Sequence, residues 1–281
     1  MQQQNTKFSL LMCVYEKENP EHLKQCLESI NELTVMPEEV VIVKDGPLTS
    51  ELDKVLAEHR FPENSHLNEN TNIVALPENV TLGPARAAGV EEAKHEWIAI
   101  MDSDDICEPD RFEKQLKMIE KNPDLSLIGG QIAEFLDDPT HATATRAVPI
   151  NLNDIVNFAK IRNPFNHMTV MFKKEAVLKA GNYRYFPLFE DYDLWTRMIK
   201  NDTICANHPD VLVDARISGG TYGRRRGFSY IGSEWRMQKQ LKKLGLINTL
   251  EFIRNVALRI PVRLLPRKVL AGVYKGFARS S

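Results

Sequence analysis

The first hundred residues alternate short apolar runs with segments of helical periodicity, and this alternation restricts the fold more than any other feature of the chain. The apolar runs predict four strands, at residues 8–14, 39–43, 72–75 and 97–101. The segments between them predict three helices, at residues 20–31, 51–59 and 84–94. Strands that are apolar along their length and separated by helices are typical of a mostly parallel sheet with helices on both faces. We therefore expect an α/β fold built on a mostly parallel central sheet.

The remainder of the chain is less regular. A helix is expected after Pro109, a strand at residues 169–172, a short helix closed by Gly181 and a longer helix beginning near Glu190. A length of 281 residues is ordinary for one large domain or two coupled ones. We expect a domain over residues 1–215, with halves at about 1–105 and 106–215, and a helical segment over residues 216–281.

The final segment differs sharply in charge from the rest of the chain. The net charge is −2, yet from Arg216 onward the only acidic residues are Glu234 and Glu251, whereas Lys and Arg recur to the end. Apolar anchors flanked by basic residues fit a helix lying in an anionic membrane surface. A helix that packs on the domain and leaves a basic face in water is the alternative. The three arginines at residues 224–226 lie between glycines, which favours a loop over a helix.

Several classes of protein do not fit this sequence. No run of about 18 apolar residues is present, as a membrane-spanning helix would need, and the first residues lack the pattern of a signal peptide. The four cysteines are scattered, with no CxxC pair, and are expected to be reduced thiols of a cytoplasmic protein. No interleaved aromatic platform or binding motif indicates nucleic acid as a partner.

The stretch "EWIAIMDSDDICEPDRF", residues 96–112, is chemically unusual because a buried strand runs directly into clustered carboxylates. Carboxylates close together raise each other's pKa unless a positive group compensates them. A calcium loop of the EF-hand type is excluded, because Ile106 and Cys107 stand where an oxygen ligand and a glycine are required. Two interpretations remain: a solvated turn that caps a helix, or a Mg²⁺ or Mn²⁺ site that holds a diphosphate.

An ordered set of motifs distinguishes these alternatives. The chain contains "SLLMCVYEKENPEHLKQCLESI", "VVIVKDGP", "LGPARAAGVEEAKHEWIAIMDSDD", "NHMTVMFKK", "AGNYR" and "FEDYDLWTRM", in this order. This set resembles the family 2 glycosyltransferases over roughly residues 8–213, and especially bacterial enzymes that build O-antigen, capsule or exopolysaccharide repeat units. The resemblance implies a GT-A fold, which is Rossmann-like, and a metal-dependent reaction with a nucleotide sugar.

The resemblance assigns donor-binding roles to residues at the ends of the predicted strands. It implies that Asp45 hydrogen-bonds the uracil of a UDP-sugar, although Asp-Gly-Pro is also an ordinary turn. It places Arg86 near the donor phosphates, where an ordinary surface arginine is the alternative. It implies Asp104 as the metal ligand, with Asp102 on the ribose or a metal-bound water. The remaining donor-side candidates are Val14 and Tyr15 against the base, Glu16 where the family often has Asn, and Ser103.

The resemblance also assigns residues to the acceptor. Asp191 matches the aspartate of the family's "ED" segment, which is taken as the base that deprotonates the acceptor hydroxyl. Glu190 is expected to contact the acceptor or order the loop. Trp195 is either core packing or a platform for a sugar, and His167 is either structural or near the acceptor. One base and one metal, with no carboxylate nucleophile, suit a single displacement with inversion.

Together these features predict an inverting glycosyltransferase that moves galactose, N-acetylglucosamine or glucose from UDP to an undecaprenyl-diphosphate-linked saccharide. Such an acceptor would place the protein on the cytoplasmic face of the inner membrane, as a peripheral protein bound through its basic segment. The arginines at residues 224–226 would suit closure over the donor diphosphate. A nucleotidyltransferase and a non-catalytic scaffold that binds nucleotide sugars are the alternatives. A nucleotidyltransferase would need a glycine-rich phosphate loop after the first strand, and "VYEKENPEH" contains no glycine. Asp104 and Asp191 argue against the non-catalytic scaffold.

Overall fold

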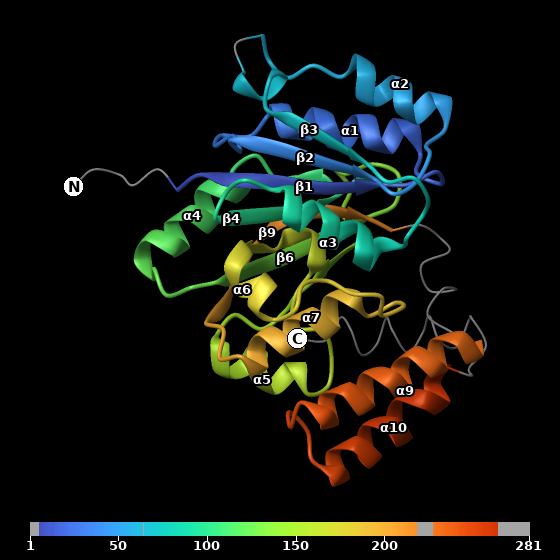
Figure 1. Ribbon diagram of the computed structural model, residues 1–281. Helices are drawn as coiled ribbons and strands as arrows, with labels where there is room; N and C mark the ends of the chain where they lie inside the picture. The colour runs from blue at the N-terminus through green and yellow to red at the C-terminus, as the bar shows by residue number, and fades with distance from the viewer. Residues whose placement is uncertain (1–5, 64, 218–226, 264–281) are drawn as a thin grey trace.

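The computed structural model describes residues 6–63, 65–217 and 227–263. Within these residues a nine-stranded sheet has the order β3-β2-β1-β4-β8-β6-β9-β5, and β7 pairs with β6 (Figure 1). The strands are β1 Phe8–Val14, β2 Glu39–Lys44, β3 Thr71–Ala75, β4 Trp97–Asp102, β5 Ile106–Cys107, β6 Leu127–Phe135, β7 Ala144–Arg146, β8 Met171–Lys173 and β9 Cys205–Arg216. The helices that flank them are α1 Pro20–Asn31, α2 Ser50–Glu58, α3 Leu82–Glu92, α4 Arg111–Lys121, α5 Leu152–Ala159, α6 Lys174–Lys179 and α7 Glu190–Lys200.

The first half of the sheet is parallel, as the sequence predicts. Strand β1 lies between β2 and β4, β3 adds to β2, and all three pairings are parallel. Six of the seven residues of β1 are buried, because helices cover both of its faces. Parallel strands connected by helices bring their carboxyl ends to one edge of the sheet. Lys44 at the end of β2 and Asp102 at the end of β4 therefore share an edge with Val14.

The second half of the sheet is mixed. Strand β8 pairs antiparallel with both β4 and β6, whereas β6 and β9 run parallel to each other. Strands β6 and β9 are long, but their sequences, "LIGGQIAEF" and "CANHPDVLVDAR", contain glycines, a proline and polar residues that weaken the strand pattern. The glycines are required by packing: a Cβ on Gly130 would lie 2.4 Å from Leu212 Cδ1 of β9.

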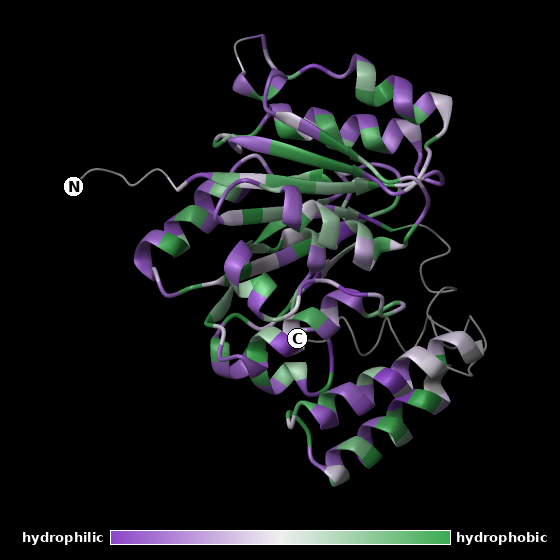
Figure 2. Ribbon diagram, in the orientation of Figure 1, coloured by the Kyte–Doolittle hydropathy of each residue, from purple (hydrophilic) through white to green (hydrophobic). Residues whose placement is uncertain are grey.

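Two apolar layers enclose the sheet. Helices α1, α2 and α4 contribute Leu23, Leu52 and Phe112 to the layer on one face. On the other face α3 and α7 contribute Val90 and Leu194, together with part of α5 and α6. Figure 2 shows the apolar residues gathered in the strands, with hydrophilic residues on the outer helices. The arrangement is a sheet between helical layers, with its polar residues concentrated at strand ends.

A helical hairpin follows the sheet. Helix α9, Gly227–Lys243, packs against α10, Thr249–Arg263, which runs in the opposite direction (Figure 1). Helix α9 also contacts α7. Phe189 and Tyr192 join Tyr230, Met237 and Leu241 in a third buried cluster at this junction. No helix among the described residues is long and apolar enough to cross a membrane. The arginines at residues 224–226 and everything after residue 263 lie outside the described residues.

Candidate active site

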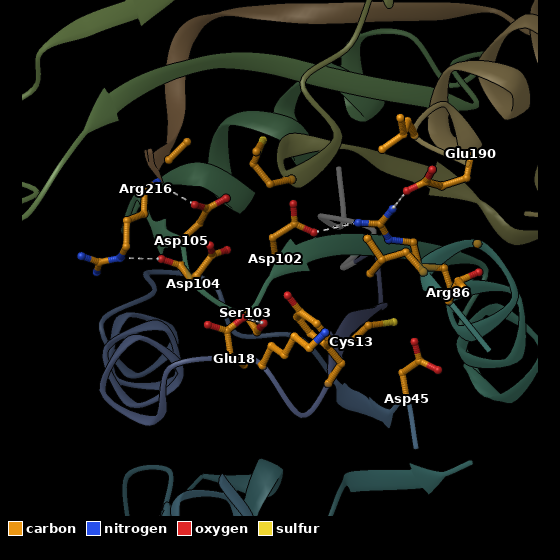
Figure 3. Close-up of a pocket in the computed structure, with 18 of the residues that line it drawn as sticks. Cys13, Glu18, Asp45, Arg86, Asp102, Ser103, Asp104, Asp105, Glu190 and Arg216 are labelled. Atoms are coloured by element: carbon orange, nitrogen blue, oxygen red, sulfur yellow. Dashed lines mark hydrogen bonds and ion pairs between the residues drawn. The ribbon is translucent and has the colours of Figure 1, made fainter. Parts of the chain in front are cut away.

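A cleft of about 790 Å³ opens at the carboxyl ends of β1, β2 and β4. This volume suits a ligand the size of a nucleotide sugar. Residues from both halves of the sheet line the cleft, including Asp45, Asp102, Asp104, Glu190 and Arg216 (Figure 3). The parallel strands deliver most of these side chains, since each strand ends at the same edge. The sequence-predicted candidates Tyr15, Arg86 and Ser103 also line the cleft.

The acidic strand end occupies the centre of the cleft, and its three carboxylates are in different environments. Burial favours protonation of Asp102, but contacts with His167 and Arg86 outweigh it and hold the pKa of Asp102 well below its usual range. Asp105 is buried and accepts the backbone N–H of Arg216 at 2.8 Å. Burial, followed by the charges of Asp104 and Asp102, raises the pKa of Asp105. Asp105 therefore anchors the loop to β9.

Asp104 differs from Asp102, which accepts a hydrogen bond from Arg86, because no side chain among the described residues donates a hydrogen bond to the Asp104 carboxylate. Arg216 Nε instead donates to the backbone carbonyl of Asp104 at 3.1 Å. Burial, and then the charges of Asp102 and Glu18, raise the pKa of Asp104 to about 7. Glu18 lines the same part of the cleft and accepts the hydroxyl of Ser103 at 2.7 Å. A divalent cation would stabilise these carboxylates in their ionised form.

The carboxylates of Asp104 and Asp102 fit Mg²⁺ or Mn²⁺ both in the type of ligand atom and in the number of ligands. Both ions prefer oxygen ligands, and Mg²⁺ commonly takes one or two carboxylates, several waters and substrate phosphate oxygens. The described residues contain no group of three or more His, Cys, Asp or Glu residues placed to hold a metal. A cation here would therefore depend on Asp104, with Asp102 nearby, and on oxygen atoms from the ligand. The close approach of Glu18 was not predicted from the sequence.

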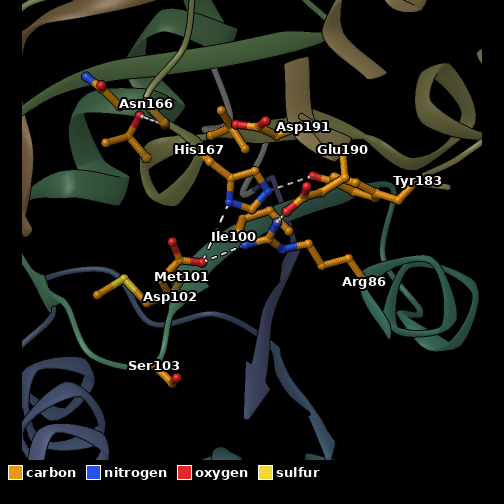
Figure 4. Close-up of polar contacts among 12 residues, drawn as sticks. Arg86, Ile100, Met101, Asp102, Ser103, Asn166, His167, Tyr183, Glu190 and Asp191 are labelled. Atoms are coloured by element: carbon orange, nitrogen blue, oxygen red, sulfur yellow. Dashed lines mark hydrogen bonds and ion pairs between the residues drawn. The ribbon is translucent and has the colours of Figure 1, made fainter. Parts of the chain in front are cut away.

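Arg86 has a different environment from the one expected. Its side chain is only 7% exposed, and it donates hydrogen bonds to Asp102 Oδ1 at 3.0 Å and to Glu190 Oε1 at 3.3 Å (Figure 4). Burial alone would lower the pKa of Arg86, but Asp102 and Glu190 raise it above its usual value. The guanidinium is thus a buried counter-ion between two carboxylates, which excludes the alternative of an ordinary surface arginine.

The β1 and β2 ends form the other wall of the cleft. Asp45 is 3% exposed, and its carboxylate accepts Val80 N–H at 2.7 Å and Asn79 Nδ2 at 3.1 Å. Burial raises the pKa of Asp45 in spite of the backbone hydrogen bonds. The turn at Gly46 has φ +84°, and a Cβ there would lie 2.7 Å from the backbone nitrogen of Asn79. Asp45 therefore both faces the cleft and fastens the loop that leads to α3.

Two of the donor-side candidates, Val14 and Glu16, do not line the cleft. Val14 is fully buried in the layer beneath α1 and does not line the cleft. Glu16 is exposed and lies outside the cleft lining. Successive residues of a strand point to opposite faces, so the side chains directed at the cleft are Cys13 and Tyr15. Applying that period to "MCVYEKE" would have selected Cys13 in place of Val14.

The acceptor-side candidates cluster at the start of α7. Glu190 lines the cleft and is paired with Arg86, and burial raises its pKa despite that pairing. Asp191 follows it in the first turn but is not part of the cleft lining; its carboxylate accepts Asn163 Nδ2 at 2.6 Å. His167 is buried: its Nε2 lies 3.1 Å from the Tyr183 hydroxyl, and its Nδ1 lies 3.7 Å from Asp102 (Figure 4).

The predicted sugar platform at Trp195 is wrong. Trp195 has no exposed surface, and its ring packs against Phe165, Phe172 and Tyr183 in the layer between α7 and the sheet. A ring without accessible surface cannot stack on a ligand. Core packing, the other interpretation of a tryptophan in a helix, is the correct one.

Comparison with known proteins agrees with this geometry. The model of the family described as Glycosyl transferase family 2 matches residues 9–181. The chain belongs to this family. It is a glycosyltransferase with the GT-A fold, and the matched region carries the β1, β2 and β4 ends that form the cleft. Family membership favours glycosyl transfer over the nucleotidyl transfer considered as an alternative.

Two bacterial relatives of this glycosyltransferase are similar to it over almost their whole length. The amylovoran biosynthesis glycosyltransferase AmsE of Erwinia amylovora is 40% identical over 272 residues, 95% of this chain and 98% of the relative. The UDP-Gal:alpha-D-GlcNAc-diphosphoundecaprenol beta-1,3-galactosyltransferase of Escherichia coli is 37% identical over 279 residues, 99% of each chain. The crystal structure of Staphylococcus aureus TarS 1-349 with UDP-GlcNAc has a TM-score of 0.66 at 14% identity, covering 97% of this chain and 74% of that one.

Proposed function

We propose that this glycosyltransferase moves a sugar from a UDP-sugar to a hydroxyl of a lipid-linked saccharide in the synthesis of a bacterial surface polysaccharide. The observation that carries the proposal is that carboxylates from two separate elements line one cleft. Asp104 faces the cleft without a side-chain donor, and Glu190 lines it from the first turn of α7, with Asp191 next in the chain. Glycosyl transfer needs a group that assists the leaving diphosphate and a base for the acceptor.

The donor half of the proposal rests on Asp45, Tyr15 and Asp104. Asp45 offers a carboxylate at the β2 end that can accept the imide N–H of uracil, a donor that cytosine lacks. Tyr15 is half-buried on the same wall and can pack against the base. A divalent cation held by Asp104, with Asp102 close by, would neutralise the charge that develops on the departing diphosphate. The E. coli relative is named for a UDP-sugar donor, which supports this choice of nucleotide.

The acceptor half of the proposal rests on residues in and around the first turn of α7. Asp191 is the proposed base: its Oδ2 is held by Asn163, which directs the carboxylate. Glu190 keeps the first turn of α7 in place through Arg86. His167 supports the same region through Tyr183. Direct displacement, which needs the base and the diphosphate site on opposite sides of the transferred sugar, would invert the anomeric centre.

The C-terminal hairpin supports action on a lipid-linked acceptor. Along α10, Leu250, Ile253 and Leu258 are 77%, 57% and 66% exposed and follow a helical repeat. Arg254 lies exposed within this stripe, and Lys242 and Lys243 are exposed at the end of α9. An apolar stripe with basic neighbours fits the surface of an anionic membrane. We propose that residues 216–281 hold the enzyme there as a peripheral protein, which suits the undecaprenol-linked substrate named for the E. coli relative.

A thermal-shift panel tests the donor site. UDP, UDP-galactose, UDP-N-acetylglucosamine and UDP-glucose should raise the melting temperature with Mn²⁺ and not with chelator. A ligand at about 100 times its Kd adds about 2.7 kcal/mol to the free energy of unfolding. Asp104→Ala should remove most of the shift, whereas Asp124→Ala, an exposed aspartate outside the cleft lining, should retain it. Equal shifts in chelator would contradict the metal assignment.

A turnover assay tests the chemistry. UDP release should require an acceptor, and Asp191→Asn should lower kcat by about 10²- to 10⁴-fold, as expected for loss of a general base. Asp191→Asn should still bind UDP with Mn²⁺, because the substitution keeps the shape of the side chain. If Glu190→Gln abolishes turnover and Asp191→Asn does not, the base has been assigned to the wrong carboxylate.

A further inference from the structure

The loop before α7, residues 184–188, presents large apolar side chains to the cleft. Tyr185 is 64% exposed and Leu188 is 48% exposed, and both line the cleft together with Phe186, Pro187 and Glu190. Isolated exposed apolar residues are common on protein surfaces and need no explanation. Here several consecutive residues line one cleft, immediately before the carboxylates of α7.

The loop is fastened at its first end by buried charge. Arg184 donates two hydrogen bonds to Asp193, at 2.7 and 2.6 Å, and Asp193 has no exposed surface. Arg197 donates to the same carboxylate at 2.9 Å. Bidentate arginine–carboxylate pairs fix geometry as well as adding energy. Helix α3 also touches the loop closely, because a Cβ on Gly83 would lie 2.3 Å from the Arg184 carbonyl oxygen.

The other end of the loop is fastened by aromatic packing. Phe189 is buried against Tyr230 of α9, with ring centroids 5.4 Å apart, and Phe186 packs on the same cluster. Between these anchors Leu188 adopts φ +70°, a conformation that is unfavourable for a bulky residue and persists only where the surroundings require it. These contacts fix the backbone conformation of the loop, and this conformation leaves Tyr185 exposed in the cleft.

We infer that Tyr185 is the platform on which the acceptor sugar stacks, with Leu188 completing the apolar wall of this subsite. This inference rests on the proposed function, since it names how the acceptor of that reaction is bound. A tyrosine ring offers a flat apolar face to the C–H face of a pyranose and a hydroxyl to the sugar's polar edge. A sugar placed there shares the cleft with Glu190, in the first turn of α7. The subsite takes the place of the platform expected at Trp195.

Binding measurements test this subsite without turnover. The full-length protein is titrated calorimetrically, with UDP and Mn²⁺ present, with N-acetylglucosaminyl diphosphate that carries a short alkyl chain. Tyr185→Ala should weaken binding of this probe about tenfold or more, the scale of one aromatic contact. Tyr185→Phe should remain within about threefold of wild type, because it keeps the ring face. Leu178→Ala, which truncates an exposed apolar residue outside the cleft lining, should have no effect.

UDP titrations on the same variants separate this inference from the proposed function. Tyr185→Ala should bind UDP with Mn²⁺ as wild type does, and its kinetic defect should fall on the acceptor KM more than on the donor KM. An unchanged probe affinity in Tyr185→Ala would overturn the platform, as would equal losses for probe and UDP. Failure of wild type to bind UDP with Mn²⁺ would instead refute the proposed donor site.

Discussion

Replacement of Arg86 by methionine distinguishes a buried counter-ion from a phosphate-binding arginine. The substitution keeps much of the side-chain volume but leaves Asp102 and Glu190, which are 30% and 15% exposed, without their shared cation. Removing one partner of a buried ion pair costs about 3–5 kcal/mol. The partial exposure of Asp102 lets water compensate some of the loss, so we expect about 3 kcal/mol. For a chain of this size that corresponds to a fall of roughly 6–12 °C in Tm.

The assay is unfolding by urea and by heat in the absence of nucleotide and metal. Lys121→Met, at an exposed lysine in the last turn of α4, should change the stability by less than about 0.5 kcal/mol. In an Asp102→Asn, Glu190→Gln background the same Arg86→Met change should cost much less, because no charge is then left unpaired. The reasoning is refuted if Arg86→Met leaves the ligand-free protein as stable as wild type while UDP affinity falls. That result would mean that Arg86 binds the phosphates of UDP and does not stabilise the fold as a counter-ion.

Three further predictions concern packing, pH and the hairpin. Gly89→Ala in α3 would place a Cβ 2.3 Å from Leu11 Cδ1 and should lower the free energy of unfolding in urea by about 1–3 kcal/mol. Gly232→Ala in α9 meets nothing within 4 Å and should raise that free energy by about 0.5–1 kcal/mol. The same change in stability for both variants would contradict the close packing of α3 on β1. Burial, with the charge of Glu108, raises the pKa of Asp214 to about 6, so this carboxyl lowers the stability of the fold as the pH rises from its ordinary pKa to about 6, and the loss is complete above that pH. Asp214→Asn should therefore raise Tm at pH 8, with the gain disappearing near pH 4, and a gain of the same size at both values would exclude this cause. Leu250→Asp with Ile253→Asp should abolish sedimentation with vesicles that contain anionic lipids while sparing UDP binding, and unchanged sedimentation would exclude α10 as the contact.

The parallel half of the fold could be predicted closely from the sequence because its strands are buried on both faces. Each of the four expected strands in this half lies within one residue of its observed bounds, from β1 to β4. Strands β6 and β9 were not predicted. In β6, Gly129 and Gly130 allow β9 to approach closely, and they lack the apolar side chains by which a strand is recognised in a sequence. Tertiary packing, which a local pattern does not record, decides the structure there.

The candidate site was predictable in position but not in its pairings. The strand-end rule located Asp45, Asp102 and Asp104 correctly on the cleft, because it depends only on topology. The partners of these groups come from distant parts of the chain: Glu18 reaches Ser103 across 85 residues, and Arg86 reaches Glu190 across 104. No spacing in the sequence specifies such contacts, and the same limit hid the burial of Trp195.

The pairing of Arg86 has a consequence for how the two substrates are brought together. One guanidinium binds Asp102, at the strand end proposed to bind the donor, and Glu190, in the helix proposed to bind the acceptor. Any change of charge at the first carboxylate therefore alters the attraction that holds the second. A cation beside Asp102 and Asp104 would compete with Arg86 for the Asp102 carboxylate, which strengthens the relative hold of Arg86 on Glu190. The start of α7 should then be more rigid with donor and metal bound than without them, which hydrogen exchange at the Asp191 and Tyr192 amides would detect as slower exchange.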